Sequence, residues 1–99
     1  MKPDELEKYW KLGGLAYEQA EYNKAIAYMS RMLDKVDATH VHYCDAHLTI
    51  GHCLVDKRQY AMAREQYRAV LSAPNALEGE REMAEKCLRD IFAVEDGRI

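Results

Sequence analysis

The sequence predicts an all-α protein of about five helices. Apolar residues recur at intervals of three and four along five separate stretches, and no stretch has the alternation typical of a strand. Only two prolines and five glycines interrupt the chain, which leaves room for long helices. A chain of 99 residues buries about two thirds of its unfolded surface, so we expect one domain with a single modest core over residues 1–99.

The first helix is expected from about Glu5 to Gln19. Asp4 and Glu7 have the spacing of a capping box at its start. The apolar and aromatic residues that follow at helical intervals are Leu6, Tyr9, Trp10, Gly13 and Tyr17. After a short turn of sequence AEY, a second helix to about Lys35 carries the stripe Ala25, Ile26, Met29, Met32 and Leu33.

Thr39 is the expected cap of a third helix that runs to Asp56, and a turn of sequence KRQ leads into the fourth. The fourth helix carries Ala63, Tyr67, Val70 and Leu71, and we expect Pro74 to end it because proline lacks the amide a helix needs. Asn75 and Glu78 repeat the capping-box spacing before a fifth helix, which ends before Gly97. Its stripe is Met83, Ala84, Cys87, Leu88, Ile91 and Phe92.

The second half of the chain repeats the first at an offset of 38 residues. The matched residues are Leu12, Gly13, Tyr22, Ala25, Met29 and Leu33 in the first unit, and Ile50, Gly51, Tyr60, Ala63, Tyr67 and Leu71 in the second. Glycine and alanine at four of these positions would let the two helices of each pair approach closely. A helix pair is therefore expected twice, followed by a single helix.

These residues resemble the tetratricopeptide repeat, whose unit of about 34 residues has an aromatic, a Leu-Gly pair, further aromatics and alanines in this order. The resemblance implies a right-handed stack of antiparallel helix pairs: repeat one over about 5–35, repeat two over about 39–73 and a capping helix over about 76–94. The first closing proline is absent, and the linker DKVDATH is about one helical turn longer than the family's. His47 stands where the second repeat would start with an aromatic residue.

The resemblance also implies a binding groove, because the first helices of tetratricopeptide pairs line a concave surface. The residues at the inward-facing positions are Glu7, Trp10, Gly14, Tyr17, Glu18, Asp45, Leu48, His52, Val55 and Asp56, with Arg81, Glu85 and Leu88 as further candidates. The centre of this set is apolar and aromatic and its edges are acidic. We therefore expect a protein or peptide partner with apolar anchors and basic flanks.

Three observations limit the choice of partner. Family members that bind the acidic tails of chaperones use asparagine and lysine where this chain has Gly14, Thr49 and Trp10, so that ligand is disfavoured. Fourteen basic residues against 17 acidic ones, interleaved without a basic cluster, argue against nucleic acid. No apolar run reaches the length of a membrane span and the start has no apolar signal segment, so a cytoplasmic protein is expected.

The expected function is that of an adaptor or co-chaperone. Two alternatives stay open: a self-assembling scaffold that dimerises through Leu6 or Phe92 at the ends of a short stack, and a chaperone for secretion substrates, whose size and charge are similar. Gly13 and Gly14 lie inside a helix and form no phosphate loop, and no activated thiolate is indicated. We expect neither an enzyme nor a cofactor.

The stretch THVHYCDAHLTIGHC contains all four histidines and two of the three cysteines. Only His40, Cys44 and His47 share one helical face, and a structural zinc site needs a fourth ligand such as Cys87. Met29 and Met32 would suit copper(I) instead. Because the shared face is also the packing face, we expect no metal, with Cys44 as a small hydrophobe and His47 in the place of a packing aromatic. His52 is expected on the groove, either titrating near neutral pH or as a solvated surface residue.

Overall fold

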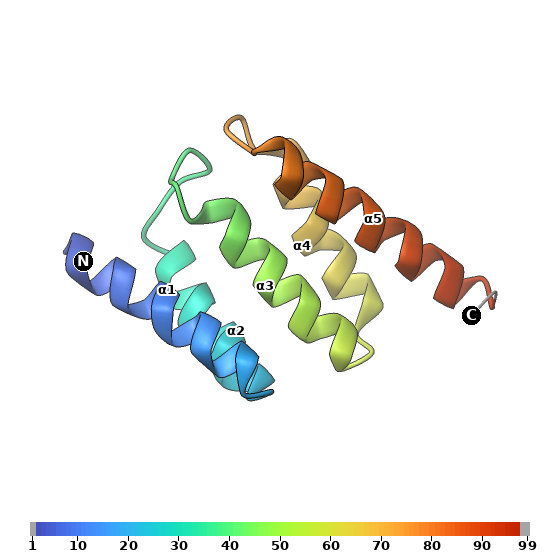
Figure 1. The fold of residues 1–99 in the computed structure, drawn as a ribbon, viewed down its shortest axis with the longest axis horizontal. Coiled ribbons are helices and arrows are strands. Elements are labelled where there is room, and N and C mark those ends of the chain that lie inside the picture. The colour runs from blue at the N-terminus through green and yellow to red at the C-terminus, as the bar shows by residue number, and fades with distance from the viewer. Residues whose placement is uncertain (1, 98–99) are drawn as a thin grey trace.

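The computed structural model describes residues 2–97, which form five α-helices and no strand. The helices are α1 (Pro3–Glu18), α2 (Tyr22–Leu33), α3 (Tyr43–Asp56), α4 (Tyr60–Ser72) and α5 (Glu78–Glu95), and they follow one another across the molecule (Figure 1). The prediction of an all-α helical stack is confirmed. None of these helices within residues 2–97 combines the length and the apolar character needed to cross a membrane.

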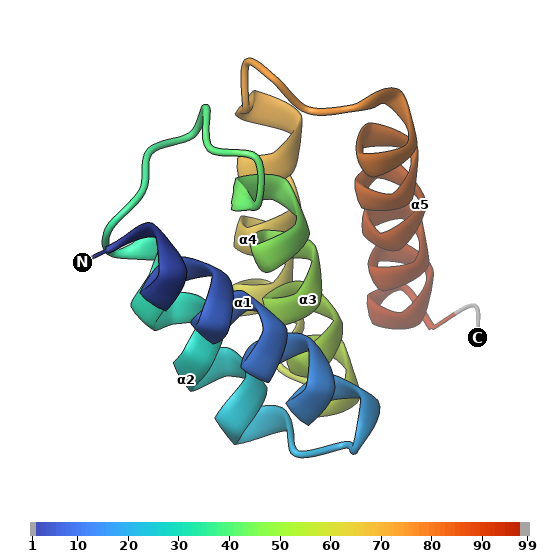
Figure 2. The ribbon, with the colours of Figure 1, turned by 60° about the vertical axis from the view of Figure 1, so that its left-hand side comes forward.

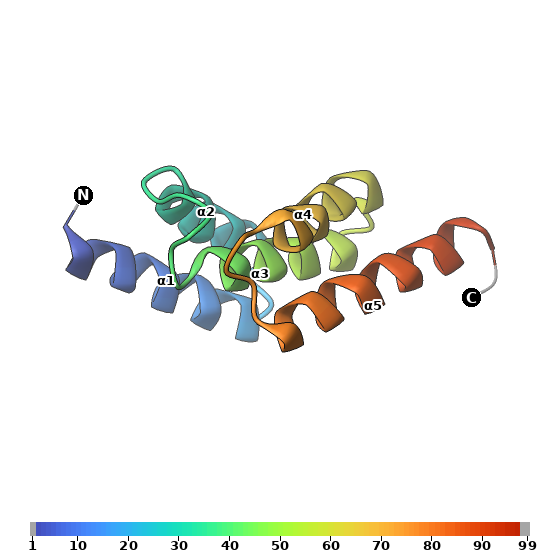
Figure 3. The ribbon, with the colours of Figure 1, turned by 90° about the horizontal axis from the view of Figure 1, so that it is seen from above.

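The helices lie in two layers. Figure 3 shows α1, α3 and α5 in one layer and α2 and α4 in the other. Each first helix packs against the helix that follows it, and α5 packs mainly on α4 and less on α3. Figure 2 shows α5 standing apart from α3 over much of its length. The candidate site described below lies along the layer of α1, α3 and α5.

Two glycines at equivalent places let the paired helices approach. A β-carbon on Gly13 would lie 2.9 Å from the Met29 side chain, and one on Gly51 would lie 2.8 Å from the Tyr67 ring. These contacts keep the 38-residue offset of the sequence, and Ala25 and Ala63 are fully buried at the other two small positions. The predicted role of the small residues is confirmed.

The turns that end α1 and α3 are also equivalent. Ala20 (φ 59°) and Arg58 (φ 61°) both have left-handed backbone conformations just after the helix, again 38 residues apart. A bond of 2.8 Å closes each turn, from the amide of Glu21 to the Ala16 carbonyl and from the amide of Gln59 to the Leu54 carbonyl. Both turns are Schellman motifs, built here without the glycine that usually occupies the left-handed position.

The predicted helix starts need correction. α1 begins at Pro3 with Lys2 as its N-cap, so the Asp4 and Glu7 capping box is wrong; proline suits the first helical position because the amide there has no helical partner. Thr39 does not cap α3, which begins only at Tyr43. The reason is that the Thr39 amide and hydroxyl both bond the Asp37 carboxylate in the preceding turn.

The capping box of α5 is also displaced, by two residues. The Glu80 carboxylate accepts a bond of 2.9 Å from the Leu77 amide, so Asn75 and Glu78 do not form the box. α2 ends at Leu33, two residues before the predicted Lys35. The predicted C-terminal ends of the fourth and fifth helices are confirmed, since α4 ends before Pro74 and α5 ends before Gly97.

Candidate functional site

Trp10 joins α1 to the beginning of α3. Its Nε1 donates a hydrogen bond of 2.7 Å to the Asp45 carboxylate, and its ring stacks on His42 with centroids 3.9 Å apart and planes 7° apart. His42 Nε2 in turn lies 2.7 Å from a Glu7 carboxylate oxygen. Trp10 is only half-buried, so it serves both core and groove: one part of the ring fixes the two helices together while the rest faces a hollow.

This hollow lies between α1 and α3, and we call it the α1–α3 hollow. Its lining residues are Trp10, Lys11, Gly14, Leu15, Tyr17, Glu18, Asp45, Thr49 and His52. Six of the ten residues predicted for the groove are among them. Gly14 borders open space in this hollow, since a β-carbon there would meet no atom within 4 Å.

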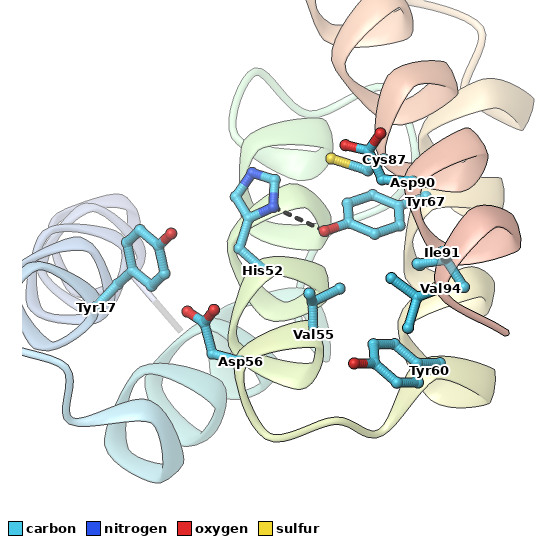
Figure 4. A pocket seen from close by; sticks show the side chains of 10 residues that line it. All are labelled: Tyr17, His52, Val55, Asp56, Tyr60, Tyr67, Cys87, Asp90, Ile91 and Val94. Carbon is cyan, nitrogen blue, oxygen red and sulfur yellow. Dashed lines mark hydrogen bonds between the residues drawn. The ribbon is translucent and has the colours of Figure 1, made fainter. Parts of the chain in front are cut away.

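A second hollow of about 250 Å³ lies between α3, α4 and α5, and we call it the α3–α5 pocket (Figure 4). Its lining residues are Tyr17, His52, Val55, Asp56, Tyr60, Tyr67, Cys87, Asp90, Ile91 and Val94. Val55 and Asp56 are two more of the predicted groove residues. Tyr17 and His52 line both hollows, so the two form one continuous surface along the layer of first helices.

His52 and Tyr67 close the pocket on the side of α3. The His52 Nδ1 and the Tyr67 hydroxyl lie 2.7 Å apart, as the dashed line in Figure 4 shows. Burial raises the pKa of Tyr67 far above its usual range, and burial lowers the pKa of His52, against the opposing effect of Asp56 and Asp45. A protonated phenol therefore donates to a neutral imidazole near pH 7. His52 lies on the groove as predicted, but it is neither exposed nor merely solvated.

Two predicted groove residues lie elsewhere. Leu48 is 8% exposed and belongs to the hydrophobic core, so its prediction as a contact residue is wrong. Glu7 is bonded to His42 and lines a separate surface hollow on α1. Repeat position alone could not identify these cases, because the equivalent residues in the other repeat, Trp10 for Leu48 and Asp45 for Glu7, do line the α1–α3 hollow.

The face that α5 turns toward the pocket also differs from the one predicted. Arg81 and Glu85 are exposed and Leu88 is half-buried against the core. The pocket is lined instead by the neighbouring stripe Cys87, Asp90, Ile91 and Val94. α5 packs mainly on α4 and less on α3, as α3 packs mainly on α2 and less on α1, so α5 does take the place of a further first helix. The residues that it turns toward the pocket are nevertheless displaced from those that the sequence alignment gave.

Sequence reasoning thus missed six of the pocket residues, Tyr60 and Tyr67 on α4 and the four on α5. A signal for the α5 residues was present, since they follow the spacing i, i+3, i+4, i+7 of one helical face. No comparable signal existed for the two tyrosines. They belong to α4, which packs against both α3 and α5 and so contributes side chains to the pocket between them.

The histidine-rich stretch is distributed over several separate contacts. His47 donates from Nδ1 to the Gln66 amide oxygen at 2.7 Å, and its ring packs edge-on against Tyr43 at 4.5 Å. It takes the place of a packing aromatic, as predicted. Cys44 and Cys53 are buried free thiols, and burial raises the pKa of both, that of Cys53 to about 11. Across residues 2–97, no three His, Cys, Asp or Glu side chains are grouped closely enough to hold a metal ion.

The two buried histidines predict a loss of stability in mild acid. Burial lowers the pKa of His47 and His52 below their usual 6.5 in the folded chain, whereas both take up protons at the usual value when it unfolds. The unfolded state therefore binds more protons just below pH 6.5, and the free energy of unfolding falls there by up to about 1.4 kcal/mol per pH unit for each histidine. Urea unfolding between about pH 7.5 and 5.5 would measure this fall. The fall in the free energy of unfolding should be shallower for the double variant His47→Gln/His52→Gln. An equally steep fall in this variant would mean that other groups cause the pH dependence.

The chain matches no model of a known protein family, and no curated protein or solved structure gives a significant match. The resemblance to the tetratricopeptide repeat therefore stays a prediction based on the repeated residues. The geometry of the two hollows is the remaining basis for a functional proposal.

Proposed function

We propose that this chain is a protein-interaction module of tetratricopeptide type that binds a peptide or an amphipathic helix across α1, α3 and α5. The observation that carries the proposal is the continuity of the α1–α3 hollow and the α3–α5 pocket, which share Tyr17 and His52. An extended surface of this kind suits an adaptor or co-chaperone in the cytoplasm, as expected for helical repeat stacks.

The chemistry of the two hollows suits a partner with apolar anchors and basic flanks. Tyr17 stands half-buried at their junction, with its ring 6.1 Å from that of His52. Half-exposed aromatic rings of this kind supply much of the energy at protein interfaces. Glu18 and Asp45 outweigh the positive charge of Lys11 in the lining of the α1–α3 hollow, and a net negative surface steers a basic partner.

Selection of peptides on the purified chain would test this proposal. A random peptide library displayed on phage is selected on the wild type, and the enriched peptides are then measured against Tyr17→Ala and Met62→Ala. Met62 is 57% exposed on α4, in the other layer, and serves as the matched control. Trp10 is unsuitable as the test residue because it also fixes α1 to α3.

We expect the enriched peptides to bind wild type and Met62→Ala equally and to bind Tyr17→Ala about tenfold more weakly, the loss typical of an interface anchor. Both variants should keep the helical circular dichroism and melting temperature of the wild type. Equal affinity for all three proteins, or no enrichment at all, would contradict the proposal.

Self-assembly remains a second candidate because α5 carries exposed apolar residues. Phe92 is 60% exposed and Met83 is 44% exposed, whereas Leu6 at the other end of the stack packs against the core. A dimer would therefore use α5. Sedimentation at several concentrations distinguishes the candidates, since a scaffold grows with concentration and an adaptor stays at the mass of one chain.

A further inference from the structure

The size of the α3–α5 pocket limits what it can hold. Sites for drug-sized ligands are usually about 300–1,000 Å³. The pocket measures about 250 Å³ and so falls below that range. It fits a single long side chain better than a whole small molecule.

The walls of the pocket are apolar where α3 and α5 face each other and aromatic on the side of α4. Val55 on α3 faces Val94 on α5 across the pocket, with Ile91 beside it (Figure 4). Tyr60 and Tyr67 contribute rings from α4. Such walls favour a hydrocarbon stem, and tyrosine faces also attract a cation at the end of one.

The charged groups of the pocket are negative. Asp56 on α3 and Asp90 on α5 are exposed carboxylates in its lining, and the lining contains no lysine or arginine. The negative charge of Asp56 acts within the pocket, where after burial it is the next cause that raises the pKa of Tyr17.

The carboxylates also have the capacity to take a further cation. No ion pair within residues 2–97 includes Asp56, whose carboxylate accepts a hydrogen bond from the Tyr22 hydroxyl. Asp90 is 2.8 Å from the Lys86 ammonium, but both side chains are more than half exposed. Exposed pairs between neighbouring helical turns contribute little, so an incoming cation can share or replace Lys86. The two carboxylates lie on different sides of the pocket, Asp56 toward Tyr17 and Asp90 beside Cys87 (Figure 4). An aliphatic stem that ends in a positive charge is therefore complementary to the apolar residues together with one carboxylate, that of Asp56.

We propose that the α3–α5 pocket binds one lysine or arginine side chain of the partner peptide. The stem lies against Val55, Ile91 and Val94, and the cation lies at the Asp56 carboxylate. This inference rests on the proposed function, since a bound peptide must supply the side chain. It names a specificity position within the groove, so every strong ligand carries a basic residue at one fixed place.

Small probes test the pocket without a known peptide. Titrations of the full chain with n-butylammonium, n-propylguanidinium and neutral 1-butanol at constant ionic strength are followed by the amide resonances of Val55, Asp56 and Ile91. The three probes imitate a lysine side chain, an arginine side chain and an uncharged stem. Alkylation of Cys87 by iodoacetamide gives a second measure of occupancy, because Cys87 lines the pocket while Cys44 and Cys53 are buried.

We expect the tighter-binding cation to bind at least about threefold more tightly than 1-butanol, and to slow the alkylation of Cys87. Asp56→Asn should weaken cation binding by about threefold to fivefold, the scale of an exposed charge pair, and leave 1-butanol unchanged. Asp34→Asn removes an exposed carboxylate just after α2, and it should change the binding of neither the cations nor 1-butanol. The tighter of the two cations identifies the preferred residue.

The outcomes separate this inference from the proposed function. The inference is overturned if 1-butanol binds as tightly as the cations, or if no probe shifts the pocket resonances. In that case, peptides from the selection that bind the groove would still support the proposed function, with an apolar anchor in the pocket. If the cations bind through Asp56 but the selection enriches no peptide, the pocket assignment holds and the proposed function fails.

Discussion

Replacing Tyr67 with alanine is expected to lower the free energy of unfolding by about 3–5 kcal/mol, the usual cost of removing a buried aromatic ring. Tyr67 is completely buried, its ring covers Gly51 on α3, and its hydroxyl is bonded to His52. A small domain has only about 5–15 kcal/mol of stability in total, so this single change should bring the chain close to unfolding.

Tyr67→Phe is the matched control for this prediction. It keeps the ring and removes only the hydrogen bond to His52, so we expect a loss of about 1 kcal/mol. Urea unfolding followed by circular dichroism measures both variants. A Tyr67→Ala protein within 1 kcal/mol of the wild type would mean that the ring does not fill the space between α3 and α4.

Gly51→Ala should be the second most damaging small change. The added β-carbon would lie 2.8 Å from the Tyr67 ring, which is rigid and buried and cannot move without displacing its neighbours. Overpacking of this kind costs about 1–3 kcal/mol, and the better helix propensity of alanine offsets at most about 1 kcal/mol of it. We expect a lower melting temperature and a lower urea midpoint.

Two other glycines provide graded controls. Gly14→Ala meets no atom within 4 Å and should stabilise the chain by about 0.5–1 kcal/mol through helix propensity alone. In Gly13→Ala the added β-carbon meets the flexible Met29 side chain at 2.9 Å, so the stability of this variant should lie between those of Gly14→Ala and Gly51→Ala. The order Gly14→Ala, Gly13→Ala, Gly51→Ala in falling stability is the expected result. If Gly51→Ala were the most stable of the three, the close packing of α3 on α4 would be wrong.

Local pattern was a good guide to the helices and a poor guide to where they start. The stripes of apolar residues and the stops at Pro74 and Gly97 depend on each segment's own sequence, and they agree with the structure. The predicted caps at Asp4, Thr39 and Asn75 do not agree with the structure. Several polar residues near each helix start can serve as a cap, and the choice depends on contacts such as the bond from Thr39 to Asp37.

The groove was predicted in part for a similar reason. Eight of the ten predicted residues line one or both hollows, because the phase of α1 and α3 follows from the repeat. Leu48 and Glu7 are exceptions although their repeat equivalents, Trp10 and Asp45, line the α1–α3 hollow, because whether such a position becomes core or surface depends on what the neighbouring helix places beside it. The pocket face of α5 was missed although its residues share one helical face, because which face of α5 meets the pocket depends on its packing against α4 and α3.

The sequence by itself determined the all-α class, the five helical segments and the 38-residue repetition, because helical periodicity and small residues at fixed positions are local properties of the chain. Only the tertiary structure decided that the site includes an α3–α5 pocket with Tyr60, Tyr67 and two carboxylates at its edge. The pocket exists because α5 leans on α4 and leaves space beside α3, and the angle between packed helices depends on many side chains acting together.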